Sequence, residues 1–272
     1  MKKIIIMCLM ILLIIGGTTV FGGSTEMITE WTIPAGGETI TLPLTGSNME
    51  VIVDWGDGNI ETVTEHLKTH EYTNETETTY TIKIQYIAGT NLKWGYKGAS
   101  APAGRSYTYT QYLNKVTKFG DIPSMEYGFA YCENLTEVSG VVGDNAFKNV
   151  TDMSNLFYMC SGLNVEIPET LFVTAYNVQS FASTFYGCSN LTGTIPENLF
   201  AENTEVENFS NTFNGCEKLS GMIPEKLFCY KPKVTTYESM FEGCKALTAG
   251  EIAIDINRVM NMDNMFKNCE SL

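Results

Sequence analysis

The sequence is poor in positive charge, and no long hydrophobic run follows its first residues. Lysine and arginine together number 17 against 31 aspartates and glutamates, giving a formal net charge of −14 over 272 residues. So acidic a chain repels nucleic acid and anionic membrane surfaces, which argues against both as partners. The simplest interpretation of the acidity is that it keeps the protein soluble.

Signatures of metal centres and of common enzymes are also missing. Two histidines and no Cys-x-x-Cys pair give almost no support to a zinc site, and we expect no metal and no cofactor. Gly-x-Ser-x-Gly, His-Glu-x-x-His and phosphate-binding glycine loops are absent. We therefore predict that the protein is not an enzyme. Paired carboxylates for glycoside cleavage need only spatial proximity, so the sequence leaves that alternative open.

The N-terminus has the pattern of a secretory signal peptide, predicted over residues 1–22. Lys2 and Lys3 precede an apolar run over residues 4–15, and small residues follow up to a cleavage site after Gly22. The alternative is an uncleaved anchor, but the run is shorter than the roughly 20 residues of a spanning helix. We expect a secreted or cell-surface bacterial protein, with no membrane insertion after cleavage.

Cysteine usage does not indicate a disulfide framework. Of eight cysteines, Cys8 leaves with the signal peptide, and the remaining seven are an odd number. Six of the seven occupy one repeating position. We interpret these six as small buried apolar residues, a role that free cysteine fills well.

Residues 24–113 have the pattern of β-structure. Apolar and polar residues alternate at 38–44, 49–54 and 78–86, and an Asp-Gly step at 57–58 predicts a hairpin turn. Short strands separated by turn residues favour a β-sandwich. The segment 53–58, followed by 70–72 and the strand at 80–84, resembles the PKD-like modules of bacterial surface proteins. The resemblance implies a spacer or presenter.

Within this segment, Asp54 and Asp57 allow two interpretations. They form either a carboxylate pair or calcium site, or a tight turn capped by aspartate with Trp55 packed inward. The second is favoured, because short aspartate side chains regularly cap turns by bonding to nearby backbone amides.

From residue 114 onward a unit of about 28 residues repeats and ends in Phe-x-x-Cys-x-x-Leu. A period of this size is typical of stacked repeats that share one core. The motif residues, which we predict to form the structural core of the repeats, are Phe129, Cys132, Leu135, Phe157, Cys160, Leu163, Phe185, Cys188, Leu191, Phe213, Cys216, Leu219, Phe241, Cys244, Leu247, Phe266, Cys269 and Leu272.

Each repeat is predicted to contain a short helix, a short strand and a helical turn. Apolar residues at i, i+3, i+7 and i+10, as in 206–216, match one face of a helix, and glycine follows where a helix would end. An extended run such as 191–195 is expected to form a parallel ladder with its neighbours. A Pro-Glu-x-Leu-Phe segment then begins a second helical turn. Residues 114–272 are thus predicted to form an α/β leucine-rich-repeat-type solenoid.

The repeats are similar to the BspA-like leucine-rich repeats of bacterial surface proteins. Residues 149–163 carry the close match to Val-Thr-x-Met-Ser-x-Met-Phe-x-x-Cys-x-x-Leu, and 258–272 are nearly as close. The resemblance implies surface display and, in some members, adhesion to host proteins or other cells. Two departures are the end at Leu272 without a polar capping unit, which suggests truncation, and the lack of a sorting signal.

We therefore expect a monomeric surface interaction protein that binds a protein or cell-surface ligand of unknown identity. The alternative is a non-binding stalk or spacer for a domain beyond residue 272. If the solenoid binds, outward positions of the strand runs are the expected ligand-binding face, although for any one of them a solvated surface residue is the favoured interpretation. These positions are Asn164, Glu166, Thr192, Thr194, Ser220, Met222 and Thr248.

Overall fold

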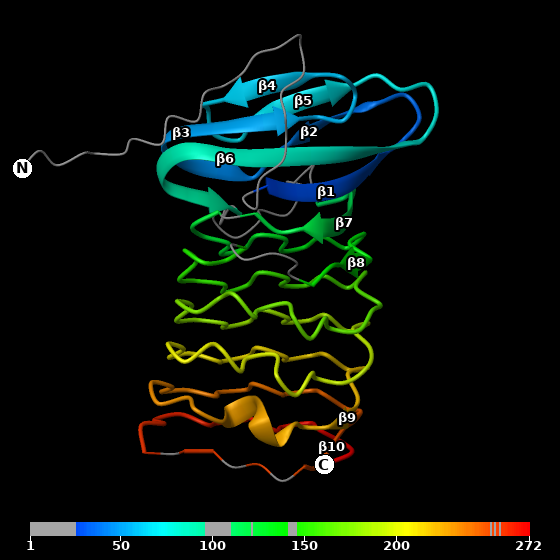
Figure 1. The fold of residues 1–272 in the computed structure, drawn as a ribbon. Helices are drawn as coiled ribbons and strands as arrows, with labels where there is room; N and C mark the ends of the chain where they lie inside the picture. Colours follow the sequence, from blue (N-terminus) through cyan, green and yellow to red (C-terminus); the bar gives the residue numbers. More distant parts are fainter. Residues whose placement is uncertain are drawn as a thin grey trace, which may run out of the picture.

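The computed structural model describes residues 26–95, 110–120, 122–140, 146–250, 252, 254–255 and 257–272. The predicted signal peptide, residues 1–22, lies outside the described residues. Figure 1 shows the longer β-strands gathered at one end of an elongated molecule, with successive layers of coil beneath them. The C-terminus lies at the end opposite these strands.

Ten strands and one short 3-10 helix are the regular elements of the described residues. The strands are β1 (Glu26–Ile33), β2 (Glu38–Thr41), β3 (Leu44–Asp54), β4 (Ile60–Val63), β5 (Thr69–Tyr72), β6 (Thr78–Trp94), β7 (Leu113–Lys118), β8 (Glu137–Val138), β9 (Gly221–Met222) and β10 (Leu247–Thr248). The strands expected at 38–44, 49–54 and 78–86 correspond to β2, β3 and β6, with β6 extending further than alternation predicted.

Six strands form a mixed sheet in the order β4-β3-β6-β1-β7-β8, and β2 pairs with β5 in a separate sheet. β1 runs antiparallel to β6 and β7, whereas β7 and β8 are parallel. Period-two alternation explains β1, because its burial alternates along the strand and places Trp31 and Ile33 in the core.

The mixed sheet continues into the repeats without a break in the core. The backbone N–H of Trp94 donates to the carbonyl of Ser124 at 3.0 Å, and the Phe119 ring lies 6.0 Å from that of Phe129. Buried apolar residues of the sheet and of the repeats belong to one hydrophobic cluster. The repeats therefore stack directly on the strand-rich end.

The predicted helix in each repeat is wrong. In the repeat at 206–216, the N–H of Thr212 donates to Phe209 and that of Cys216 to Phe213, which are the bonds of separate tight turns. The third residue of each turn, Asn211 (φ 58°) in the first and Gly215 (φ 76°) in the second, is left-handed, which prevents a continuous helix. An apolar spacing of three and four residues fits such turns as well as it fits a helix.

The expected fold class, a β-sandwich followed by an α/β solenoid, is therefore contradicted. The protein is almost entirely β and turn, with a mixed sheet and no α-helix among the described residues. The one helical element is the 3-10 helix η1 (Glu225–Phe228), which follows Pro224; the equivalent segments after Pro168 and Pro196 are turns. The expected parallel ladder consists of the short pair β9–β10 and isolated bridges such as Glu166–Thr192.

Hydrogen bonds and stacked rings join each repeat to the next, and we call residues 122–272 the repeat stack. The N–H of Phe213, for example, donates to the carbonyl of Met240 in the following repeat at 2.9 Å. The motif phenylalanines stack one upon another with ring centroids 5.4–5.7 Å apart. Motif residues are buried in the first five copies, whereas Phe266 and Leu272 of the sixth are exposed.

Candidate functional site

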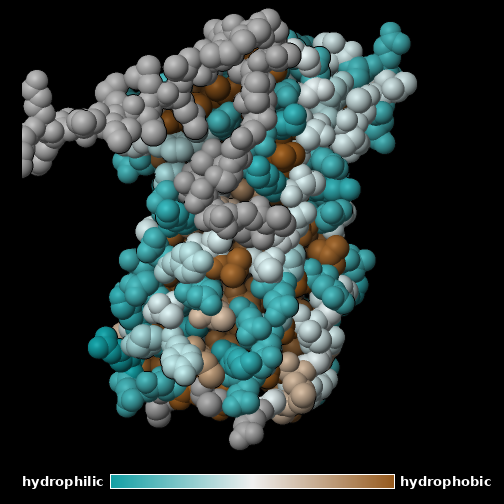
Figure 2. Space-filling view, viewed as in Figure 1, coloured by the Kyte–Doolittle hydropathy of each residue, from teal (hydrophilic) through white to brown (hydrophobic). Residues whose placement is uncertain are grey.

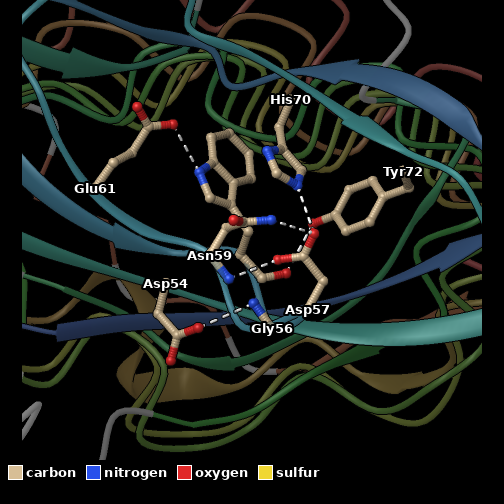
Figure 3. A network of polar contacts seen from close by, with 8 residues as sticks. Asp54, Gly56, Asp57, Asn59, Glu61, His70 and Tyr72 are labelled. Carbon is tan, nitrogen blue, oxygen red and sulfur yellow. Dashed lines mark hydrogen bonds and ion pairs between the residues drawn. The ribbon is translucent and has the colours of Figure 1, made fainter. Parts of the chain in front are cut away.

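The turn between β3 and β4 carries the polar cluster shown in Figure 3. The carboxylate of Asp54 accepts the N–H of Gly56, and that of Asp57 accepts the N–H of Asn59, both at 3.0 Å. Gly56 has a φ of 78°, and a β-carbon there would collide with the carbonyl of Thr81. Both aspartates therefore cap the turn.

Aromatic packing fixes the same turn from the other side. Trp55 is fully buried, stacks on His70 with centroids 4.4 Å apart, and donates from Nε1 to Glu61 at 2.9 Å. His70 Nε2 lies 2.8 Å from Asp57, and the Tyr72 hydroxyl donates to the Trp55 carbonyl. Because β5 supplies His70 and Tyr72, the cluster joins the two sheets.

The ionisation of this cluster reflects its packing. Burial raises the pKa of Asp57, but hydrogen bonds from Asn59 and His70 outweigh it and hold that pKa below its ordinary value. Burial also raises the pKa of Tyr72 well above the usual range. Among the described residues, no three His, Cys, Asp or Glu side chains are grouped to hold a metal ion.

The predicted ligand-binding residues lie in register along the repeat stack. Bridges join Glu166 to Thr192 and Thr194 to Ser220, and Met222 pairs with Thr248. All seven positions, including Asn164, are at least partly exposed. We call this surface the strand face. It contains hydroxyl groups, one amide, one carboxylate and the 67%-exposed side chain of Met222.

Glycine in the next repeat gives room for side chains of the strand face. A β-carbon at Gly193 would meet the Cγ of Glu166, and one at Gly221 would meet the Cγ2 of Thr194 at 2.7 Å. Both glycines have positive φ. The side chains of Glu166 and Thr194 therefore lie against Gly193 and Gly221 of the following layer.

The repeat cysteines are all free thiols, and only Cys269 of the six is not fully buried. The Sγ of Cys188 donates to the carbonyl of Phe157 at 3.0 Å, a bond that other repeats reproduce and that the sequence did not reveal. Burial raises the pKa of Cys188 to about 12. A thiol that stays protonated is a poor nucleophile, so these residues hold the fold.

Four tyrosines lie close together in the first three repeats, and the sequence pattern did not predict that they form one surface. Tyr131 and Tyr158 have ring centroids 5.4 Å apart, and Tyr158 and Tyr186 stack at 4.8 Å. Burial and the neighbouring tyrosines, Tyr127 among them, raise the pKa of Tyr158. The available signal was Tyr131, which stands where later repeats carry glycine.

The described residues contain no helix long and apolar enough to cross a membrane. Comparison with known proteins finds no match among curated proteins and none among solved structures. A comparison with protein families finds one family, described as "Mycoplasma protein of unknown function, DUF285", matching twice, over residues 123–226 and 173–272. Together these matches span residues 123–272, more than half of the chain and nearly all of the repeat stack, so this protein belongs to the DUF285 family.

Proposed function

We propose that this protein is an exported interaction protein of the bacterial cell surface, and that the strand face of its repeat stack binds an extended ligand. The observation that carries the proposal is the register of that face. Thr192, Ser220 and Thr248 occupy the same position of three successive repeats, joined by bridges to residues of the neighbouring layer. Hydroxyl groups repeated in this way can hydrogen-bond a ligand that runs along the stack.

The composition of the face supports a polar partner. Glu166 is its only charged residue, and Met222 is its only large exposed apolar side chain. Hydrophilic residues cover most of the visible surface of the repeat stack in Figure 2, with hydrophobic residues between them. We infer a monomer that binds a protein or a cell-surface ligand without catalysing a reaction.

A second candidate function is a structural stalk or spacer. The continuous core between the mixed sheet and the repeats favours it, because such a connection holds the two ends at a fixed separation. Regular hydrogen bonds between repeats stiffen the molecule further. A stalk requires no ligand at the strand face, which distinguishes the two functions.

The test measures binding of the full exported chain to immobilised extracellular-matrix proteins and to whole host cells. The variant Thr192→Ala/Thr194→Ala/Met222→Ala removes three side chains of the strand face. The control, Glu169→Ala/Thr204→Ala/Glu225→Ala, removes three exposed side chains elsewhere in the repeats. We expect at least a tenfold loss of binding for the first variant alone. Equal binding by both variants, or no binding by the parent protein, contradicts the strand-face proposal.

A further inference from the structure

Each repeat bends its chain through two left-handed residues, four positions apart. The first is Asn or Ser in every repeat but one, where it is Tyr127. The second position is occupied in turn by Tyr131, Met159, Gly187, Gly215, Gly243 and Asn268. Glycine and asparagine adopt this conformation readily, whereas other residues are strained by it. The large side chains at these positions, Tyr127, Tyr131 and Met159, all belong to the first two repeats.

Burial explains these bulky residues only in part. Tyr131 is 41% exposed and Met159 is 39% exposed, so a large part of each strained side chain remains in contact with solvent. The structure accommodates them all the same: a β-carbon at Gly187 would collide with the Sδ of Met159, whose side chain extends across the next layer. Strained, exposed residues of this kind point to interaction with another molecule.

These residues form one continuous surface with the stacked tyrosines. Tyr158 lies between Tyr131 and Tyr186, with centroid distances of 5.4 and 4.8 Å. We call Tyr127, Tyr131, Tyr158, Met159 and Tyr186 the tyrosine patch. Further along the stack, the position of Tyr158 and Tyr186 is taken by Asn214, Glu242 and Lys267, so the patch ends after the third repeat. Tyrosine and methionine are enriched in protein interfaces.

The charges beside the patch are acidic. Glu133, two residues from Tyr131, is exposed, and among the described residues its carboxylate has no ion-pair or hydrogen-bond partner. Lys93 already pairs with Glu126 at 3.4 Å. An exposed carboxylate two residues from a tyrosine of the patch suits a partner with a guanidinium or ammonium group, which can pair with the carboxylate and stack on a tyrosine ring.

We propose that the tyrosine patch, with Glu133, binds an arginine- or lysine-bearing segment of a protein partner. This inference rests on the proposed role as an interaction protein but not on the strand face, which belongs to a different segment of each repeat. The net charge of −14 attracts such a segment to the molecule, and the patch fixes where it binds.

The decisive variant is Tyr131→Gly/Met159→Gly. It introduces the residue that three later repeats carry at this position, and it leaves the net charge unchanged. The probe is a nine-residue peptide of alternating arginine and glycine, titrated into the full exported chain by calorimetry at low and at physiological salt. We expect at least fivefold weaker binding with a melting temperature that is unchanged or higher. Asn268→Gly, the same replacement outside the patch, should bind the peptide like the parent.

Glu133→Gln gives an independent test that preserves the fold. It should weaken peptide binding at least threefold, whereas Glu207→Gln, an equal loss of charge at an exposed site three repeats away, should have little effect. Unchanged peptide binding by both patch variants overturns the proposal. So does a lower melting temperature for the glycine variant combined with normal binding by Glu133→Gln, because the patch is then structural. If the patch variants lose binding to neutral oligosaccharides but bind the peptide like the parent, the patch is a sugar-binding surface and the proposal is wrong. Strand-face variants should bind the peptide normally, which separates this test from that of the proposed function.

Discussion

Replacing Lys231 by methionine should stabilise the protein at neutral pH. Lys231 is only 5% exposed, and among the described residues its ammonium makes a single hydrogen bond, from Nζ to the carbonyl of Cys229 at 3.0 Å. No carboxylate among the described residues forms an ion pair with it. Burial therefore lowers the pKa of Lys231 from 10.5 to about 8, because the charged ammonium is poorly solvated in the folded state.

The sign of the pH dependence follows from that pKa. The unfolded chain binds the proton more tightly than the folded one, so the cost of the buried charge is fully present below about pH 8 and is lost as the pH rises towards 10.5. A pKa change from 10.5 to about 8 corresponds to about 3 kcal/mol. Methionine removes this cost but loses one hydrogen bond of about 1 kcal/mol. The net gain at pH 7 is therefore about 2 kcal/mol, or about 4–8 °C in melting temperature.

Thermal and urea unfolding between pH 7 and 10.5, under reducing conditions, measure this effect. The advantage of Lys231→Met over the parent should shrink steadily from about pH 8, cross zero near about pH 10, and then reverse towards about 1 kcal/mol in favour of the parent, whose hydrogen bond remains when the lysine is neutral. Lys226→Met, at an exposed lysine paired with Glu197 at 3.2 Å, should change stability by no more than about 0.5 kcal/mol. The reasoning fails if Lys231→Met is no more stable at pH 7, or if its advantage does not depend on pH.

Three further predictions concern buried groups and backbone geometry. In the native protein a thiol reagent should modify half-buried Cys229 first and Cys269 more slowly, with the other repeat cysteines reacting only on unfolding; fast modification of more than two cysteines contradicts the burial. Gly37→Ala should destabilise by at least about 1 kcal/mol more than Gly36→Ala in urea titrations, because both have positive φ but only Gly37 faces a backbone carbonyl, that of Tyr72. Cys188→Ser should lower the free energy of unfolding by about 1 kcal/mol, the low end of the 1–3 kcal/mol expected for an unpaired buried hydroxyl, because the Phe157 carbonyl can accept a hydrogen bond from the serine. A larger loss of stability shows that this bond does not form.

The sequence revealed the repeat and its buried residues but not the conformation between them. Phe213 and Cys216 were assigned to the core correctly, because apolar residues recurring in register must face a shared interior. The helix through them was wrong because Asn211 and Gly215 are left-handed, and asparagine and glycine at four-residue spacing were the only sign of it. Gly215 was interpreted as a helix cap rather than as one of a series of bends.

The candidate sites were predictable to different degrees. The strand face followed from alternation around Thr192, and the structure places its residues on adjacent layers. The tyrosine patch was not foreseen, since Tyr131, Tyr158 and Tyr186 come from three repeats and meet only through stacking. The pairing of His70 with Asp57 likewise depends on β5 packing against the β3–β4 turn, which no local pattern specifies.

The placement of strain along the stack favours interaction over simple spacing. A non-glycine residue in the left-handed conformation costs roughly 1–2 kcal/mol, so Tyr131 and Met159 together cost about 2–4 kcal/mol. A spacer selected for stability alone would carry glycine at both positions, as Gly215 and Gly243 do further along the same stack. Stacking between tyrosines adds about 0.5–1.5 kcal/mol per pair beyond burial, and the covered part of each side chain offsets a further part of this cost. The strain is concentrated at two large side chains that are 41% and 39% exposed, which distinguishes these two repeats from those that carry glycine.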